Sequence, residues 1–209
     1  MKTRERILQA GLALFNERGE AAVSLAQIAA QLGISEGNLW YHFRTKRDLV
    51  AALFAESEAR VERNLSRPPS EAGDQLADFA AYATQAFRDI WDYRFLYRRH
   101  FHQTVDAALA ARLVALTERG HRYNERILEE MVRRRLMRAS PAEISELTAN
   151  AWIISRYWLD YLQERHGVDT LSAPDIEAGV KQIFALYRPY LSEAALAQTA
   201  APQRKRARG

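Results

Sequence analysis

Residues 24–49 read SLAQIAAQLGISEGNLWYHFRTKRDL, and this stretch decides the fold of the N-terminal part of the chain. Ser24 followed three residues later by Gln27 is a capping-box pattern, which predicts the start of a short helix. Gly33 is a residue type that ends helices in the left-handed conformation, and Ser35 is then a second N-cap. Two short helices joined by a tight turn predict a helix-turn-helix unit.

The residues on both sides of this stretch complete a small helical domain. An apolar stripe with helical spacing precedes it and predicts a bracing helix, with the residues Ile7, Ala10, Gly11, Leu14 and Phe15. Gly19 follows as the expected stop of that helix. Thr45 and Asp48 resemble another capping box, from which a fourth helix should run to about Asn64. The N-terminal part is therefore expected to be a compact group of helices.

The helix that follows Ser35 has one apolar and one polar face. Leu39 and Phe43 lie four residues apart and should face the core. The outward residues are Glu36, Gly37, Asn38, Tyr41 and His42, with Trp40 on the flank. In helix-turn-helix units such a helix lies in the major groove of DNA, with its N-terminal residues toward the base edges. We expect Asn38 and Tyr41 to contact bases or phosphates, and Gly37 to allow a close approach.

Several residues of this segment also have a plainer interpretation. Trp40, Tyr41 and Phe43 could all belong to the core, and His42 could cap or pack against the end of the first helix. Arg44, Lys46 and Arg47 could be no more than a solvated charge cluster. The occurrence of several caps, a turn and outward polar groups within one short window favours the DNA-binding interpretation.

The string from Arg4 to Ala52 resembles the N-terminal domain of the TetR-type (tetracycline-repressor-like) family of bacterial transcriptional regulators. GISEGNLWYHF at residues 33–43 and KRDL at residues 46–49 carry the resemblance. Trp40 stands where the family usually has a groove-facing tyrosine, and its indole keeps an N–H donor but has no acceptor. The resemblance implies phosphate contacts by Ser24 and Lys46. The full set of expected DNA contacts is Ser24, Ser35, Glu36, Gly37, Asn38, Trp40, Tyr41, His42 and Lys46.

The rest of the chain is expected to be helical, which makes the fold class all-α. Apolar periodicity predicts helices over about residues 71–91, 95–103, 107–117, 118–137, 141–165 and 173–189. Arg67-Pro68-Pro69-Ser70 is the strongest loop signal and marks the expected domain boundary. The expected parts are a helix-turn-helix domain (1–48), a connecting helix (49–67), a larger effector-binding and dimerisation domain (68–195) and a disordered basic tail (196–209).

The larger domain is rich in aromatic residues. By resemblance, it should bind a small effector that changes the position of the DNA-reading helices. Pockets between helices tend to be apolar with a few polar groups. On this basis the expected effector-binding residues are Phe79, Tyr82, Phe87, Tyr123, Trp152 and Arg156. For any one of these aromatics, a place in a well-filled core is the alternative, and an ion pair with Asp160 is the alternative for Arg156.

Two helices of the larger domain are candidates for a two-fold dimer interface. Ser140, Pro141 and Glu143 should start the first of these helices, and Gly167 should end it. This helix is apolar over so wide an arc that it must be buried on two sides. The expected interface residues are Ile154, Trp158, Leu162, Ile176, Val180, Ile183, Phe184 and Tyr187. A homodimer would place its two helix-turn-helix domains on the two halves of a palindromic operator.

Composition limits the other function classes. The chain has no cysteine, which excludes disulfides and thiolate chemistry, and no cofactor is expected. No apolar run approaches the roughly 20 residues of a membrane span, so we expect a cytoplasmic protein. His100, His102 and Asp106 resemble a metal site in composition, but a spacing of two points the histidines in different directions on a helix. We expect a DNA-binding repressor that is released by an effector and is not an enzyme; a helical interaction or ligand-carrier domain is the alternative.

Overall fold

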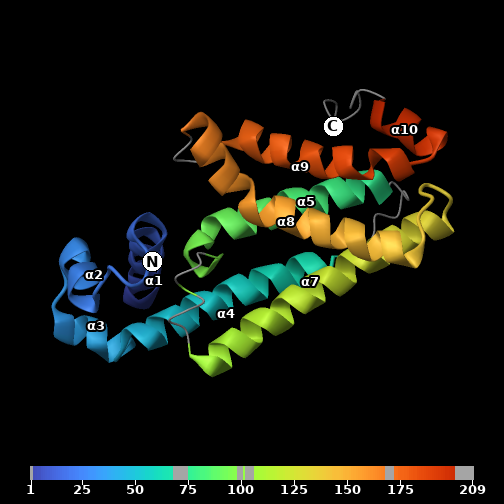
Figure 1. Ribbon diagram of the computed structural model, residues 1–209. Helices are drawn as coiled ribbons and strands as arrows, with labels where there is room; N and C mark the ends of the chain where they lie inside the picture. The colour runs from blue at the N-terminus through green and yellow to red at the C-terminus, as the bar shows by residue number, and fades with distance from the viewer. Residues whose placement is uncertain (1, 68–74, 98–100, 102–105, 168–171, 201–209) are drawn as a thin grey trace, which may run out of the picture. The chain divides into compact units, whose positions relative to one another are not determined.

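The computed structural model describes residues 2–67, 75–97, 101, 106–167 and 172–200, and helices account for nearly all of them. The elements are α1 (Thr3–Arg18), α2 (Leu25–Leu32), α3 (Glu36–His42), α4 (Lys46–Leu65), α5 (Gln75–Asp92), the 3-10 helix η1 (Arg94–Tyr97), α7 (Ala107–Arg133), α8 (Pro141–His166), α9 (Ala173–Tyr187), the 3-10 helix η2 (Arg188–Tyr190) and α10 (Glu193–Ala200). Within these ranges there is no strand, only an isolated bridge between Met137 and Leu191. The all-α fold class is confirmed (Figure 1).

The chain folds into two compact units. Unit 1 contains Met1–Arg63 and Asp89–Leu116, and unit 2 contains Asn64–Arg88 and Thr117–Gly209. The described residues between Asp89 and Leu116 therefore pack with the N-terminal helices, which the sequence did not indicate. The expected domain boundary at Pro68–Ser70 lies outside the described residues.

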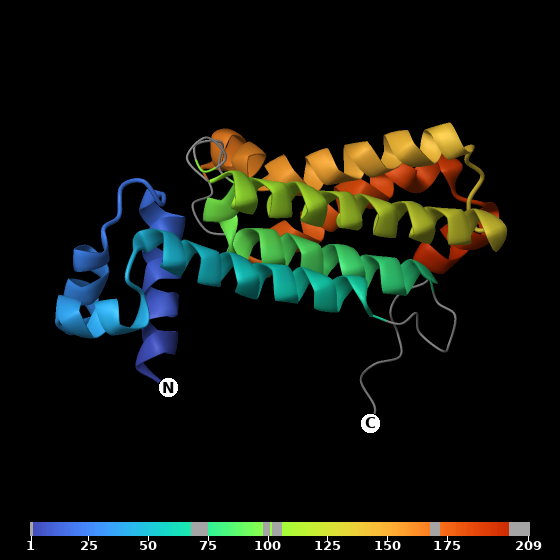
Figure 2. The ribbon, with the colours of Figure 1, turned by 90° about the horizontal axis from the view of Figure 1, so that it is seen from below.

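Unit 1 has a continuous apolar core beneath the helix-turn-helix. In Figures 1 and 2, α1, α2 and α3 form a small bundle beside the first turns of α4. The buried residues include Ile7, Leu14, Phe15, Ile28, Leu39, Phe43, Leu49, Leu53 and Phe54. Gly11 lets α1 and α4 approach closely, because a Cβ at this position would lie 2.9 Å from Leu49 Cδ2.

Unit 2 has its own core, formed where α8 runs alongside α9 (Figures 1 and 2). Its buried residues include Leu76, Phe79, Phe87, Leu128, Met131, Ile144, Leu147, Val180, Ile183 and Tyr187. One polar network is buried among them, since Asn124 Nδ2 donates to Thr148 Oγ1 (2.9 Å) and to Tyr187 Oη (3.2 Å). These bonds satisfy polar groups that would otherwise destabilise an apolar interior.

Local signals in the sequence predicted most helix ends. The Ser24 hydroxyl accepts a hydrogen bond from Gln27 N, and the Gln27 side chain accepts one from Ser24 N. The same reciprocal pattern occurs between Ser140 and Glu143 at the start of α8, and between Thr45 and Asp48. Gly167 ends α8 in the left-handed conformation, with φ of 64°. These predicted caps are confirmed.

Four expectations about the helices were wrong. α7 runs without a break from Ala107 to Arg133, so the predicted division at residue 117 does not exist, and Gly120 lies inside the helix. Instead of a helix starting at Phe95, a 3-10 turn begins at Arg94, and most of the range up to residue 103 lies outside the described residues. α9 ends at Tyr187, and η2 takes its place up to Tyr190. Finally, residues 196–200, expected in the tail, belong to α10.

Within the described ranges, no helix is both long enough and apolar enough to cross a membrane.

Candidate nucleic-acid interface

The turn between α2 and α3 has the geometry that a helix-turn-helix requires. Gly33 adopts a left-handed conformation (φ 65°), which ends α2, and its N–H donates to Ala30 O at 3.1 Å. Ile34 N donates back to Ala29 O at 3.1 Å, so the chain reverses within two residues. The Ser35 hydroxyl then accepts from Asn38 N and starts α3. Each hydrogen bond satisfies a backbone group that a helix end leaves without a partner.

α3 presents two different faces. Leu39 is fully buried, whereas Glu36, Gly37 and Asn38 are exposed to solvent. Tyr41 is 85% exposed and Trp40 is 51% exposed, so two large aromatic side chains lie at the surface of one short helix. The interpretation of Tyr41 as a core residue is thereby excluded. A large exposed apolar surface usually marks a place where a partner binds.

The remaining predicted residues of α3 also lie at its surface. The nearest atom to a Cβ built on Gly37 would be Ser35 Oγ at 4.0 Å, so nothing inside the protein requires a glycine there. His42 is half-buried and packs edge-on against Tyr41, with 5.1 Å between the ring centroids. Ser24 and Ser35 use one acceptor lone pair for their caps and keep their O–H donors. A hydroxyl at a helix N-terminus that keeps its donor can bind a phosphate oxygen.

Lys46 has a partner that the sequence did not predict. Its Nζ donates to the Glu20 carbonyl oxygen at 3.0 Å and forms an ion pair with Glu20 Oε1 at 3.1 Å. The next residue, Arg47, forms an ion pair through Nε with Asp106 Oδ2 at 3.1 Å. Both cations at the start of α4 are thus held by carboxylates of the same chain. No local pattern shows this, because Glu20 and Asp106 lie 26 and 59 residues away in sequence.

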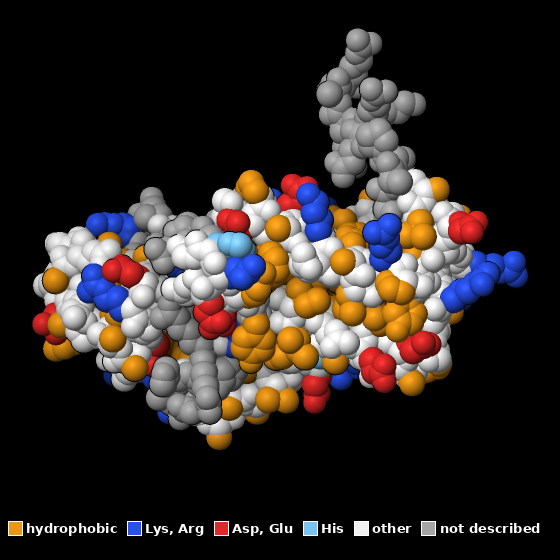
Figure 3. All heavy atoms as spheres, turned by 45° about the horizontal axis from the view of Figure 1, so that its top comes forward, with side chains coloured by type: hydrophobic (Ala, Val, Ile, Leu, Met, Phe, Trp, Pro, Cys, Tyr) orange, Lys and Arg blue, Asp and Glu red, His pale blue; other side chains and the backbone are white. Residues whose placement is uncertain are grey.

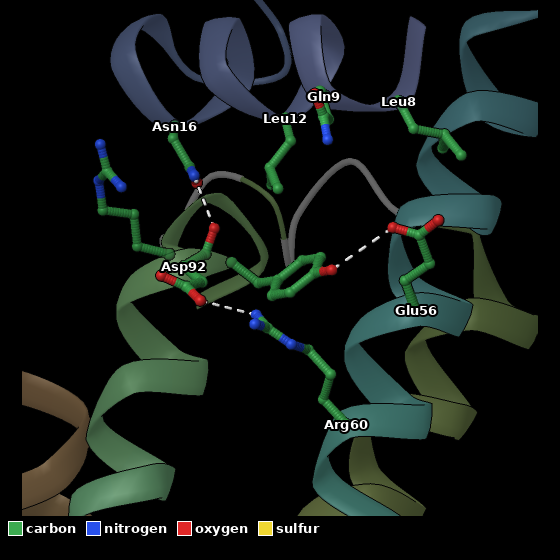
Figure 4. Close-up of a pocket in the computed structure, with 9 residues that line it drawn as sticks. Leu8, Gln9, Leu12, Asn16, Glu56, Arg60 and Asp92 are labelled. Atoms are coloured by element: carbon green, nitrogen blue, oxygen red, sulfur yellow. Dashed lines mark hydrogen bonds and ion pairs between the residues drawn. The ribbon is translucent and has the colours of Figure 1, made fainter. Parts of the chain in front are cut away.

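A pocket of about 410 Å³ opens in unit 1 between α1, α4 and the end of α5. Figure 4 shows Arg60 reaching from α4 to Asp92, where Nη1 and Oδ2 are 2.7 Å apart. Tyr93 Oη donates to Glu56 Oε2 at 3.5 Å. Burial, together with the Glu56 carboxylate, raises the pKa of Tyr93, so the phenol remains a donor. Charged groups of both signs line the pocket and largely compensate one another.

Asn16 connects α1 to the segment that closes this pocket. Its Nδ2 donates to the Asp92 carbonyl oxygen at 2.7 Å, and its Oδ1 accepts from Phe95 N at 3.1 Å. The side chain is buried, and its partners are more than 75 residues away in sequence. Figure 4 shows its amide directed from α1 toward the end of α5. A single amide therefore ties the helix that braces α2 and α3 to the turn at η1.

The predicted effector-binding residues divide into two groups. Phe79, Tyr82 and Tyr123 come together, with ring centroids 6.4 Å apart for Phe79–Tyr82 and 4.9 Å for Tyr82–Tyr123. Burial raises the pKa of Tyr82, and the neighbouring Tyr123 and Tyr187 add to this, so its hydroxyl is neutral.

Of the other three residues, Phe87 belongs to the same buried core as Phe79, whereas Trp152 lies at the surface. Phe87 is buried against Gly179, and Trp152 is exposed beside His121, with 5.8 Å between the rings. Arg156 lies over the ring of Tyr157, 5.5 Å from its centroid.

Most of the predicted dimer residues pack inside unit 2 of the same chain. Leu162, Ile176, Val180, Ile183 and Tyr187 are buried, and Ile154, Trp158 and Phe184 are partly buried against the unit 2 core. The exposed large side chains of α8 are Trp152, Ile153, Tyr157 and Tyr161. We call these four residues the α8 apolar face. Figure 3 shows hydrophobic side chains gathered on the side of unit 2 where α8 and α9 lie.

Of the residues considered for a metal site, the structure describes only Asp106. His100 and His102 lie outside the described residues. Asp106 Oδ1 accepts from the backbone N–H groups of Ala108 and Leu109, while Oδ2 contacts Arg47. These contacts assign Asp106 to the start of α7 and to an ion pair.

Family models match most of the chain. A model described as "Bacterial regulatory proteins, tetR family" matches residues 7–53, which include the helix-turn-helix. A second model, described as "Bacterial transcriptional repressor", matches residues 58–199.

Among curated proteins, the HTH-type transcriptional regulator AcrR of Shigella flexneri is 34% identical over 77 residues, a match that covers 36% of each chain. Matches to the curated relatives thus span only about a third of their length.

Solved structures match over nearly the whole length. A TetR-family transcriptional regulator from Marinobacter aquaeolei VT8 is 31% identical, with a TM-score of 0.81 over 95% of this chain and 97% of that chain. A bacterial regulatory protein in the tetR family from Rhodococcus RHA1 has a TM-score of 0.71 over 92% of this chain and 100% of that chain. At 17% identity the second similarity concerns the fold alone.

Proposed function

The chain belongs to the TetR family of bacterial transcriptional regulators, and from this premise we propose that it is a repressor that binds a palindromic operator as a homodimer and leaves it when a small effector binds. The observation that carries the proposal is the solvent-exposed face of α3, where Asn38, Trp40 and Tyr41 surround the bare backbone of Gly37. Such a protein acts in the cytoplasm.

The two kinds of DNA contact are distributed over different residues of unit 1. Asn38 and Tyr41 have the side chains that reach base edges in a major groove, by hydrogen bonds or by contact with a thymine methyl group. Ser24 and Ser35 offer hydroxyl donors to phosphates at the starts of two helices. Trp40 offers its indole N–H from the flank of α3. Specific protein–DNA interfaces divide their contacts in this way: phosphate contacts position the protein, and base contacts recognise the sequence.

Dimerisation is proposed through the α8 apolar face. Ile153, Tyr157 and Tyr161 are four residues apart and form one stripe along the helix, with Trp152 beside it. A contiguous exposed stripe of large apolar side chains is typical of a protein–protein interface. A two-fold contact through this face would give the protein two helix-turn-helix domains related by symmetry. Such a dimer would fit a palindromic target.

The effector is proposed to bind near an aromatic cluster of unit 2 in which Phe79 is buried and Tyr82 and Tyr123 are partly buried. Phe79, Tyr82 and Tyr123 offer an apolar, aromatic surface, and Asn124 and Tyr187 offer polar groups next to it. A site of this kind favours a ligand with apolar groups and few hydrogen-bonding groups. A ligand screen that finds only strongly polar binders would contradict this part of the proposal.

The DNA-binding proposal is tested by selecting duplexes from a random pool with the purified protein and measuring affinity for the selected site. We expect an inverted repeat, bound more weakly as salt rises, because phosphate contacts release counterions. Tyr41→Ala should weaken binding by about 1–3 kcal/mol, the usual value of a base contact. Val114→Ala, which removes an exposed apolar side chain on α7, is the matched control and should not change it. If no duplex is enriched, the protein is a helical ligand carrier or interaction domain.

A further inference from the structure

We infer that Glu20 and Asp106 compete with DNA phosphates for Lys46 and Arg47, and thereby set the affinity of the protein for its operator. The inference rests on the proposed function and adds to it two residues that lower DNA binding. Lys46 and Arg47 are the first residues of α4, beside the recognition helix α3. Both are engaged in the free protein by carboxylates from other segments of unit 1.

The Lys46–Glu20 contact is built into the loop that follows α1. The Glu20 carbonyl oxygen accepts from Val23 N at 3.3 Å as well as from Lys46 Nζ, so the same residue shapes the turn and holds the ammonium group. The Glu20 side chain is 17% exposed and that of Lys46 is 32% exposed. A pair that is partly shielded from water is screened less by salt than a fully exposed one. A phosphate must therefore share or replace Glu20 at this ammonium group.

The Arg47–Asp106 contact is held in place by the hydrogen bonds of Asp106 at the start of α7. Asp106 Oδ1 accepts from the N–H groups of Ala108 and Leu109, which holds the carboxylate at the start of α7. The hydrogen bond from Leu109 N, aided by Arg47, lowers the pKa of Asp106, so it stays ionised near neutral pH. The Arg47 side chain is 71% exposed, so a phosphate can reach its guanidinium group while Asp106 holds one edge.

The other carboxylate of this segment is occupied elsewhere. Asp48 Oδ2 accepts from Thr45 N at 2.9 Å, and the Thr45 hydroxyl accepts from Asp48 N, so Asp48 serves as part of a helix cap. Glu20 and Asp106 are thus the carboxylates paired with the first two cations of α4. Each places a negative charge within hydrogen-bonding distance of a cation at the start of α4, the helix that follows α3.

The consequence for DNA binding follows from counterion release. Each phosphate neutralised by a protein cation contributes about −0.9 to the slope of log K against log salt concentration. A cation already neutralised by a carboxylate contributes less, and the carboxylate also repels the phosphate. Because these contacts involve phosphates and not bases, their release should strengthen binding to all sequences alike.

The experiment measures operator affinity between 50 and 200 mM salt for Glu20→Gln and Asp106→Asn. Both substitutions keep the shape of the side chain and its oxygen acceptor, and Asn is a good N-cap, so the fold should be preserved. We expect each variant to bind more tightly than the wild type, with a slope steeper by about 0.9, so that its advantage falls by about threefold over this range. Specific and nonspecific duplexes should gain equally.

Glu118→Gln is the matched control, because it removes one carboxylate from an exposed i,i+4 ion pair with Arg122 in unit 2 and changes the net charge by the same amount. A second measurement combines Glu20→Gln with Lys46→Gln. Lys46→Gln should cause a larger loss of operator affinity in the Glu20→Gln background than in the wild type. The two losses should differ by the factor by which Glu20→Gln alone raises the affinity.

The outcomes separate the two proposals. If the wild type binds an operator but Glu20→Gln and Asp106→Asn behave like Glu118→Gln, the competition is overturned while the proposed function stands. Weaker binding by Glu20→Gln would also overturn it, because the carboxylate would then orient Lys46 toward DNA. If the wild type binds no duplex at any salt concentration, both proposals fail.

Discussion

Asn16 joins two segments of unit 1, because its two polar atoms form hydrogen bonds with the backbone of two different residues. The amide donates to the carbonyl of Asp92 and accepts from the N–H of Phe95, both inside unit 1. Nothing near Asn16 in sequence identifies these partners, because they come from the end of α5 and from η1. From the sequence alone, Asn16 looks like an ordinary polar residue near the end of an amphipathic helix.

Asn16→Ala should therefore lower the free energy of unfolding by about 1–3 kcal/mol, because it leaves a buried backbone N–H without its partner. Urea unfolding followed by circular dichroism measures the change. Gln9→Ala removes an exposed amide from the same helix and the same pocket and should stay within about 0.5 kcal/mol of the wild type. Equal effects of the two substitutions would show that the Asn16 bonds add no stability.

The two internal glycines of unit 2 differ in what surrounds them, although both lie inside helices. A Cβ on Gly179 would lie 2.7 Å from Phe87 Cζ and 2.9 Å from Trp158 Cδ1, whereas a Cβ on Gly120 would have nothing within 4 Å. Trp158 cannot move freely, since its Nε1 donates to Asp175 O at 2.8 Å. The glycine in α9 is required by packing, and the glycine in α7 is not.

Gly179→Ala should destabilise the protein by about 1–3 kcal/mol through overpacking. Gly120→Ala should instead stabilise it by up to about 1 kcal/mol, because alanine favours the helix and meets no neighbour. Thermal unfolding of the two variants beside the wild type measures both effects. The prediction fails if the two changes shift the unfolding midpoint in the same direction.

The N-terminal cap of α8 makes stability depend on pH in a definite direction. Hydrogen bonds from the backbone N–H and the hydroxyl of Ser140 lower the pKa of Glu143 below its ordinary value. The carboxylate therefore stabilises the folded state above its unfolded pKa, and this contribution is lost as the pH falls through the lowered pKa. The difference in unfolding free energy between the wild type and Glu143→Ala should shrink as the pH drops below about 4.5.

Urea titrations at a series of pH values measure this difference. Glu164→Ala removes a carboxylate from an exposed position near the other end of α8 and provides the comparison. A difference for Glu143→Ala that stays constant down to pH 2 would contradict the cap as its source.

At the scale of elements, the sequence predicted the beginnings of helices better than their continuity. Caps such as Ser24 with Gln27 depend on neighbours within one turn, so a local pattern is sufficient to recognise them. The predicted division of α7 at Thr117 was wrong, because Leu116, Leu128 and Met131 of this helix are buried in cores formed with residues distant in sequence, which a local pattern does not reveal. α10 was missed because it follows the breaker Pro189 and is short.

At the scale of the whole molecule, the sequence identified α8 as a helix apolar on more than one side but did not show which side faces the core. The stripe that contains Leu147, Ala151 and Leu162 is buried within unit 2, and the stripe that contains Ile153, Tyr157 and Tyr161 is exposed. Periodicity cannot distinguish two apolar stripes of one helix, because both satisfy the helical spacing. The dimer residues proposed here are therefore those of the α8 apolar face.

Tyr157→Glu should dissociate the proposed homodimer, because a carboxylate would lose its water in the centre of an apolar interface. Sedimentation velocity at micromolar concentration measures the change, and operator affinity should fall with it, since each monomer can hold only a half-site. Val114→Glu places the same charge at an exposed apolar position on α7 and should leave the dimer intact. If the wild type sediments as a monomer, the α8 apolar face is not a self-association surface.

Trp40 gives the chain an intrinsic fluorescent reporter. It is one of four tryptophans, and about half of its side chain, 51%, is open to solvent on the recognition helix. An indole emits at shorter wavelength when water is removed from around it and is quenched when nucleobases stack on it. The emission of Trp40 would therefore follow the arrival and departure of DNA in real time, without a dye on either partner. A tyrosine at this position would have left the recognition helix without so distinct a signal.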